Sequence, residues 1–165
     1  MARPVQLGED YRGEEGRVGY LLRQTVHAFH AAMEGGLRQY DLTSAQYGAL
    51  YVLLLEPGLS AADVARAMGT TAQAASLLVS GMERDGLVRR EPHPTHGRVL
   101  ELYATEEGTR RFYAAQPFIT LLEERMCEGL TTAQLPIVKR WLVDSARRLT
   151  ASPRRHESVR PPVDS

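Results

Sequence analysis

The 165-residue sequence has one cysteine, Cys127, and no long hydrophobic run. A single thiol excludes an internal disulfide and any zinc site that needs several cysteines, and it suits a reducing compartment. The longest apolar run, residues 47–55, is far shorter than the roughly 18 residues of a membrane-spanning helix. The first 16 residues include acids and lack the apolar core of an export signal. These absences predict a cytoplasmic protein that does not bind a membrane.

An excess of charge of either sign is also absent. The chain has 20 basic and 20 acidic residues, and residues 60–104 contain five arginines and five acids. No lysine or arginine occurs between Thr70 and Met82. Because nucleic-acid binders usually concentrate basic residues on their binding face, any DNA affinity must come from a few locally placed arginines.

Patterns of a catalytic site are missing too. The sequence has no serine-nucleophile pattern, no phosphate-cradling glycine loop and no pair of carboxylates arranged for acid–base chemistry. It therefore predicts no catalytic residue, no cofactor and no enzymatic activity. His27 and His30 lie one helical turn apart, but without a third ligand nearby they do not favour a metal site. Cys127 is best explained as a buried structural thiol, with oxidant sensing the less favoured alternative.

Apolar residues recur every three or four positions between residues 16 and 40, which predicts a long amphipathic helix. Gly35 and Gly36 are expected to weaken the end of this helix. Thr43 or Ser44 then provides the N-cap of a second helix. The apolar face of the first helix consists of Val18, Leu22, Val26, Phe29 and Met33.

Two short helices with capping signals follow. Ser60 and Asp63 form a capping box before a helix over residues 61–68. Thr70 and Gln73 form a second capping box, so the fourth helix is expected to begin after Thr70 and to end at an Asp-Gly pair. A short helix, a tight turn and a second helix are the elements of a helix-turn-helix.

The periodicity then changes from helical spacing to alternation. Residues 87–90 and 99–103 are predicted as two strands. Pro94 and Gly97 supply the turn between them, since proline presets one backbone angle and glycine adopts positive φ. The two strands form a β-hairpin, which is the wing of a winged helix-turn-helix.

Long helices flank this module. Thr105 caps a fifth helix that Pro117 should kink or split, and Thr131 or Thr132 opens a sixth. The flanking helices hold apolar surface that the central module cannot cover, so two chains are expected to pack as a homodimer. The predicted fold class is mainly α with a small β-hairpin wing. We predict a flexible N-terminus over 1–15, a single domain over 16–150 and a disordered tail over 151–165. Within the domain, the winged helix is expected at about 42–104. The N- and C-terminal dimerisation helices are expected at about 16–40 and 105–150.

A family resemblance is strongest in three pieces: GLSAADVARAMG at residues 58–69, ERDGLV at residues 83–88 and the T-x-x-G of residues 105–108. With the hairpin between the last two pieces, residues 42–108 resemble the MarR family of ligand-responsive transcriptional regulators. The resemblance implies a homodimer that binds a pseudo-palindromic operator in double-stranded DNA. It also implies repression until a small aromatic or anionic effector releases the DNA.

Two positions depart from the family pattern. Ser76-Leu77 stands where members usually have Ser-Arg, and His96-Gly97-Arg98 stands where the wing usually has Asp-x-Arg. An alternative interpretation therefore stays open, in which the dimer kept the fold, lost strong DNA binding and acts as a ligand-binding or protein-interaction module. The balanced charge of residues 60–104 favours this alternative, whereas the intact capping, turn and wing signals favour the regulator.

The candidate DNA contacts centre on the fourth helix. Gln73, Ser76 and Ser80 share a face, and glutamine can bond two edge atoms of an adenine, although an ordinary solvated helix face is the alternative. Thr71 lies at the helix N-terminus, where free backbone N–H groups favour a phosphate. Arg98, beyond the wing turn, is the best candidate to enter the minor groove. The full set of predicted DNA contacts is Ser60, Arg66, Thr71, Gln73, Ser76, Ser80, Arg89, Arg90, His96 and Arg98.

An effector site is predicted between the first helix and the DNA-binding lobe. His30 lies beside the apolar face of the first helix. Tyr47 and Phe112 could join it, because the family binds small effectors there. Core packing alone explains these three residues about as well.

Overall fold

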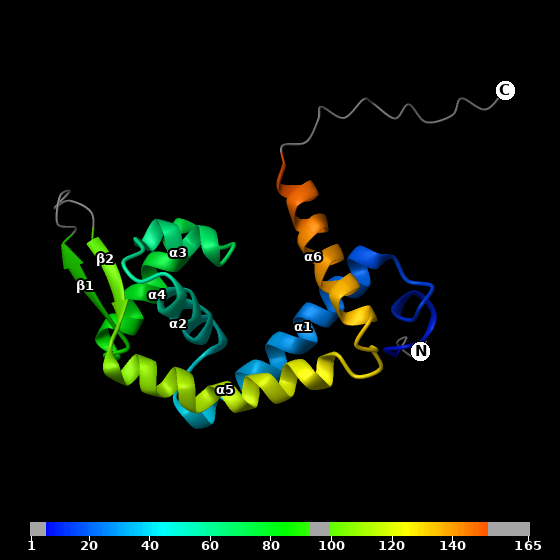
Figure 1. Cartoon of the computed structure of the whole chain (residues 1–165), viewed down its shortest axis with the longest axis horizontal. Helices are drawn as coiled ribbons and strands as arrows, with labels where there is room; N and C mark the ends of the chain where they lie inside the picture. The colour runs from blue at the N-terminus through cyan, green and yellow to red at the C-terminus, as the bar shows by residue number, and fades with distance from the viewer. Residues whose placement is uncertain (1–5, 93–99, 152–165) are drawn as a thin grey trace, which may run out of the picture. The chain divides into compact units, whose positions relative to one another are not determined.

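The computed structural model describes residues 6–92 and 100–151 (Figure 1). The chain forms two units, Met1–Met126 and Cys127–Ser165. The second unit contains the helix α6 (Gln134–Thr150). The first unit contains, in order, η1 (Asp10–Arg12), α1 (Val18–Leu37), η2 (Arg38–Tyr40), α2 (Ser44–Leu55), α3 (Ala61–Ala67), α4 (Ala72–Arg84), β1 (Val88–Pro92), β2 (Leu100–Ala104) and α5 (Glu106–Met126), where η marks a 3-10 helix.

The three helices α2, α3 and α4 are followed by an antiparallel β-hairpin. β1 pairs with β2 with Val88 opposite Ala104, and an isolated bridge from Leu59 joins the segment before α3 to β2. This arrangement is a winged helix-turn-helix, so the predicted mainly-α fold class with a small hairpin is confirmed. The tip of the wing, residues 93–99, lies outside the described residues.

Two helix starts follow the capping signals in the sequence. The Thr43 hydroxyl accepts a hydrogen bond from the Gln46 amide at 3.1 Å, and the Gln46 side chain accepts one from the Thr43 amide at 2.9 Å. Ser60 and Asp63 make the same reciprocal pair at the start of α3. Each box satisfies backbone donors that a helix N-terminus would otherwise leave unpaired.

The start of α4 was predicted one residue too early. Thr71, not Thr70, is the N-cap, and its hydroxyl accepts a hydrogen bond from the Ala74 amide at 3.1 Å. Thr70 instead completes the end of α3, because its amide donates to the Ala65 carbonyl at 2.9 Å while Gly69 adopts a φ of 62°. This is a Schellman-type ending, and it uses the backbone of Thr70 before α4 can begin.

The core of the first unit lies between α2, α4 and the hairpin, with α1 and α5 closing one side. α4 contributes its inward face, and Figure 1 shows α5 leading away from the hairpin and lying beside α1. The largest fully buried side chains are Leu37, Leu50, Leu53, Met82, Leu87, Leu102, Val64 and Val79. This packing leaves the opposite face of α4 open to solvent.

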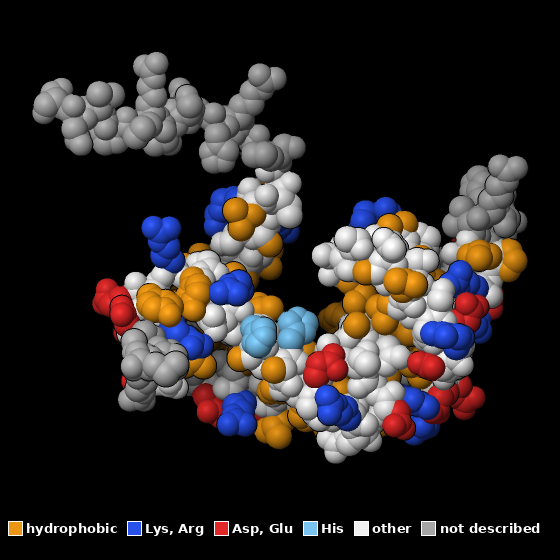
Figure 2. Space-filling model, turned by 180° about the vertical axis from the view of Figure 1, so that it is seen from behind, with side chains coloured by type: hydrophobic (Ala, Val, Ile, Leu, Met, Phe, Trp, Pro, Cys, Tyr) orange, Lys and Arg blue, Asp and Glu red, His pale blue; other side chains and the backbone are white. Residues whose placement is uncertain are grey.

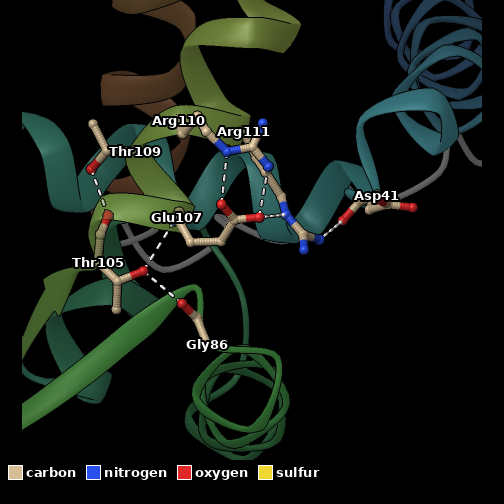
Figure 3. Close-up of polar contacts among 8 residues, drawn as sticks. Asp41, Gly86, Thr105, Glu107, Thr109, Arg110 and Arg111 are labelled. Carbon is tan, nitrogen blue, oxygen red and sulfur yellow. Dashed lines mark hydrogen bonds and ion pairs between the residues drawn. The ribbon is translucent and has the colours of Figure 1, made fainter.

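The joint between the wing and α5 is built on Thr105 (Figure 3). Its hydroxyl donates to the Gly86 carbonyl at 2.6 Å and accepts from the Gly108 amide at 3.0 Å. Its own amide donates to the Leu87 carbonyl at 3.0 Å. A Cβ at Gly108 would overlap that same carbonyl, so the close approach requires glycine. The T-x-x-G sequence therefore ties the end of α4 and both strands to α5.

α1 and α5 are more continuous than predicted. α1 runs through Gly35 and Gly36 to Leu37, and α5 runs through Pro117 without splitting. A Cβ at Gly36 would overlap the Phe118 ring, so Gly36 serves close packing of α1 against α5 and does not end the helix. Pro117 is exposed on α5.

Glu34 links α1 to the start of α2. Its carboxylate accepts hydrogen bonds from the hydroxyl and the amide of Ser44, the latter at 2.8 Å. The Ser44 hydroxyl and amide together lower the pKa of Glu34 below 4.5. The ionised form of Glu34 therefore stabilises the connection between the long helix and the winged-helix lobe.

α6 begins near the predicted position. The Thr131 amide donates to the Gln134 side chain at 2.9 Å, and α6 starts at Gln134. No residue of α6 is buried, although it carries several large apolar side chains. Its exposed large apolar residues are Ile137, Trp141, Leu142, Val143 and Leu149. Across residues 6–92 and 100–151, no helix has the length and apolar character needed to span a bilayer.

We expect Gly108→Ala to lower the free energy of unfolding by about 1–3 kcal/mol, because its methyl group would overlap the Leu87 carbonyl. Gly81→Ala is the matched control, since the nearest atom to its Cβ would be Arg84 Nη2 at 3.8 Å. This control should gain about 0.5–1 kcal/mol from helix propensity. Urea unfolding at one protein concentration measures both changes. Equal stability of Gly108→Ala and wild type would contradict the required close approach.

We expect Glu34→Gln to lower stability near neutral pH, because the amide replaces a charged acceptor. The pKa of Glu34 in the folded chain lies below 4.5, so ionised Glu34 stabilises the fold above that pH. This stabilisation is lost as the pH falls through the folded pKa. The difference in unfolding free energy between wild type and variant should therefore shrink below pH 4.5. A difference that persists unchanged in acid would assign the loss to packing and not to charge.

Candidate nucleic-acid interface

The outward face of α4 is mostly polar and lies away from the core. Gln73, Ser76 and Ser80 are all exposed, as the sequence predicted for one helical face. Ala75 and Val79, on the opposite face, are fully buried. The helix is therefore anchored by one side, and its other side is exposed to solvent.

The N-terminal end of α4 suits an anion. The first backbone N–H groups of a helix have no acceptor within the helix, and they carry the positive end of its dipole. α4 has no acidic residue in its first turn, and Thr71 occupies the N-cap. A phosphate can therefore approach this end without competing carboxylates.

Arginines on α3 and β1, near α4, are paired with carboxylates of the same chain. Arg66 pairs with Asp63, and Arg89 pairs with Glu91. Figure 2 shows Lys and Arg side chains interspersed with Asp and Glu on the surface, with no broad basic patch in that view. Of the arginines that the sequence predicted as DNA contacts, Arg66, Arg89 and Arg90 each lie beside a carboxylate, whereas Arg98 lies outside the described residues.

Arg90 and Ser80 form one unit. Arg90 Nη2 donates to the Ser80 hydroxyl at 3.1 Å, and Arg90 Nε lies 3.1 Å from Glu83 Oε2. Both predicted contact residues are therefore held by each other before any DNA arrives. Arg90 is partly buried along the edge of α4, so β1 and α4 share this interaction.

Tyr103 was missed at the sequence level. The Arg89 guanidinium lies over its ring, with the carbon 4.8 Å from the ring centroid. The Tyr103 hydroxyl donates to Glu101 at 2.7 Å, and this hydrogen bond raises the pKa of Tyr103. Only the register of the hairpin, which places Arg89 opposite Tyr103, could have indicated the pair.

The other predicted contacts have varied surroundings. Ser60 is half-buried, and its hydroxyl donates to Asp63 Oδ2 at 2.5 Å within the capping box. Ser60 therefore has a structural role at the start of α3. His96 and Arg98 lie outside the described residues. Arg84, in the last turn of α4, is exposed beside this face.

Two of the three predicted effector residues meet in a cavity. Tyr47 and Phe112 are buried and stack with ring centroids 4.7 Å apart and an angle of 18°. They line a cavity of about 400 Å³ together with residues of α1, α2 and α5, among them Phe29, Met33, Tyr51 and Glu123. His30 is exposed on α1 and does not line this cavity.

The cavity has an electrostatic bias. Burial raises the pKa of the Tyr47 hydroxyl, and the nearby Glu123 carboxylate raises it further. Among the described residues that line the cavity, Glu123 is charged and none is a lysine or an arginine. The site is thus aromatic and partly apolar, and the charged side chain in its described lining is an acid.

Comparison with known proteins identifies the family. A MarR family model matches residues 40–99. The chain is 31% identical over 91 residues to the transcriptional regulator HosA of Escherichia coli, which covers 55% of this chain and 67% of HosA. The chain belongs to the MarR family. It is a transcriptional regulator of that family, as the sequence resemblance implied.

Two further proteins extend the comparison over most of the chain. The HTH-type transcriptional repressor Rv2887 of Mycobacterium tuberculosis is 28% identical over 129 residues, which are 78% of this chain and 93% of Rv2887. The structure of S. aureus MepR in complex with DNA superposes with a TM-score of 0.74 at 23% identity. That match covers 80% of this chain and 98% of MepR, and it shows a shared fold.

The histidine pair and the cysteine are the remaining candidates from the sequence of this MarR-family protein. His27 and His30 are exposed, and no cluster of three metal-binding side chains occurs in the part of the chain that the structure describes. The pale-blue histidine side chains of Figure 2 are open to solvent. Cys127 is half-buried, which is less enclosed than the buried thiol that was predicted.

We expect Glu91→Gln to raise affinity for duplex DNA of any sequence, because Arg89 loses the carboxylate that competes with phosphate. The salt dependence should also steepen, by a slope of about 0.9 for one additional phosphate contact. Glu124→Gln on α5 makes the same change in net charge without a described arginine partner, so it should change neither quantity. Equal gains in the two variants would attribute the effect to net charge alone.

Proposed function

We propose that the chain is a repressor that binds a pseudo-palindromic operator as a homodimer. The α4 helices of two subunits would enter successive major grooves about 34 Å apart. The observation that supports this most directly is the capped helix α4, whose outward face is exposed and mostly polar while its opposite face is buried. A face held rigidly in this way suits groove binding, and a MarR-fold neighbour, MepR, has been solved with DNA.

The residues divide into two roles. Gln73 and Ser76 would contact base edges, since glutamine bonds adenine at two atoms. Thr71, Arg66, Arg89 and Arg90 would contact phosphates. The remaining phosphate and minor-groove contacts would come from the wing residues His96 and Arg98.

The dimer would cover apolar surface on the flanking helices. On α1, Val18 is 61% exposed, and on α6, Trp141 is 42% exposed. Burial of such surface contributes roughly 25 cal/mol per Å², so a two-chain interface of ordinary size supports micromolar assembly or tighter. Sedimentation that finds a folded monomer at micromolar concentration would rule out the dimer.

The effector would bind in the cavity beside Tyr47 and Phe112. This cavity is lined by α1, α2 and α5, so an occupant contacts both the long helices and the DNA-binding lobe. A ligand that favours one spacing of the two lobes shifts the population toward it and releases DNA if that spacing does not fit. Of the two effector classes implied by the family, the lining favours an uncharged aromatic molecule, because Glu123 repels an anion.

A second candidate function follows from the paired arginines. If Arg66, Arg89 and Arg90 stay with their carboxylates, little positive charge remains for phosphates. The chain would then be a ligand-binding or protein-interaction dimer that kept the fold. Selection of duplexes from a random pool by the purified full-length chain separates the two functions, because only the repressor enriches a sequence.

On the selected operator, Gln73→Ala should lower affinity by about 1–3 kcal/mol, and it should change affinity for a scrambled duplex little. Gln39→Ala is the matched control, since Gln39 is exposed in η2 and away from α4 in sequence. Both variants are measured on both duplexes at one salt concentration. If Gln73→Ala leaves the ratio of the two affinities unchanged, α4 does not read bases through Gln73.

A further inference from the structure

The outward face of α4 contains one large apolar side chain, Leu77. It is 68% exposed, although leucine is usually buried. Gln73 lies four residues before it, Ser80 three residues after it and Arg84 seven residues after it, so all four share one side of the helix. Leu77 is therefore at the centre of the proposed DNA-facing surface and not at its margin.

Leu77 contributes little to the core of the described chain. The buried residues of α4, Ala75, Val79 and Met82, lie on the opposite side of the helix. The adjacent Leu78 packs partly against the core, whereas Leu77 is not part of that cluster. The folded chain thus gains little from an apolar side chain at this position, and Leu77 is free to contact a partner.

The neighbours of Leu77 allow close approach to a surface. Ala74 and Gly81, one turn before and one turn after, are small, and Ser76 and Ser80 are short. Leu77 extends beyond these side chains. A helix docked in a groove would therefore press Leu77 against base edges, with Gln73 and Arg84 beside it.

The chemistry of the major groove selects one partner for such a side chain. The edges of the bases there display hydrogen-bond donors and acceptors, and the C5-methyl of thymine is the apolar group. Leucine can neither donate nor accept, so against any other base edge it would cover polar groups without pairing them. Contact with a thymine methyl removes apolar surface of both partners from water.

We infer that Leu77 contacts the 5-methyl group of a thymine in each half of the operator and thereby specifies that base. The inference rests on the proposed function, because it requires α4 to enter the major groove. It assigns to Leu77 a role in sequence preference, in place of the phosphate contact that an arginine at this position would make.

The test removes the methyl group and nothing else. Each thymine of the selected operator is replaced in turn, in both half-sites, by deoxyuridine, which keeps every hydrogen-bonding atom. For the wild-type chain, one symmetric replacement should weaken binding by about fourfold per half-site, the value expected for burial of one methyl group. Leu77→Ala should lose this sensitivity at that position and keep any sensitivity at the others.

Leu55→Ala is the matched control, because Leu55 is 64% exposed on α2 and lies outside α4. It should respond to deoxyuridine as the wild type does. If Leu77→Ala and the wild type respond equally at every thymine, the inference is overturned while operator binding stands. If the wild type enriches no sequence at all, the proposed function and this inference fail together.

Discussion

The hydroxyl of Thr105 is the contact on which the arrangement of the DNA-binding lobe depends. It joins the Gly86 carbonyl, just after α4, to the Gly108 amide in the first turn of α5. Beside it, Glu107 pairs with Arg110 and Arg111, which lower its pKa to about 2, and Arg111 reaches the Asp41 carbonyl at 3.0 Å. One short segment thus holds α4, the wing and the turn before α2 against α5. In the proposed ligand response, a change on the long helices would reach α4 through these contacts.

The pairing of arginines with acids changes how DNA binding should work in this regulator. In most DNA-binding proteins an excess of positive charge supplies affinity for any sequence. In the proposed complex, Arg66, Arg89 and Arg90 would exchange a carboxylate for a phosphate, so part of the electrostatic gain would be offset. Under this proposal, sequence preference would depend more on the fit of α4, through Gln73 and Leu77, than on the number of phosphates contacted.

The cavity beside Tyr47 and Phe112 lies between the helices α1, α2 and α5. Both rings are part of the hydrophobic core, so an occupant would contact the residues that hold α2 against α5. Glu34 connects α1 to the start of α2 through Ser44 on the same side of the lobe. Coupling between ligand and DNA would therefore pass through packed side chains and capped helix ends that have few alternative arrangements.

The sequence by itself determined the order of helices and strands, the N-cap of α2 to within Thr43 or Ser44, the capping box at Ser60 and the exposed face of α4. These follow from local periodicity and from hydrogen bonds a few residues apart. Tertiary structure decided what depends on distant residues. Gly36 continues α1 because the Phe118 ring packs against it, and Arg90 is held by Ser80 and Glu83 across the strand–helix junction. Even the shift of the α4 cap from Thr70 to Thr71 arose because the end of α3 had already used the Thr70 amide. Such pairings form only when the folded chain brings their partners together, so they cannot be predicted from the periodicity of the sequence.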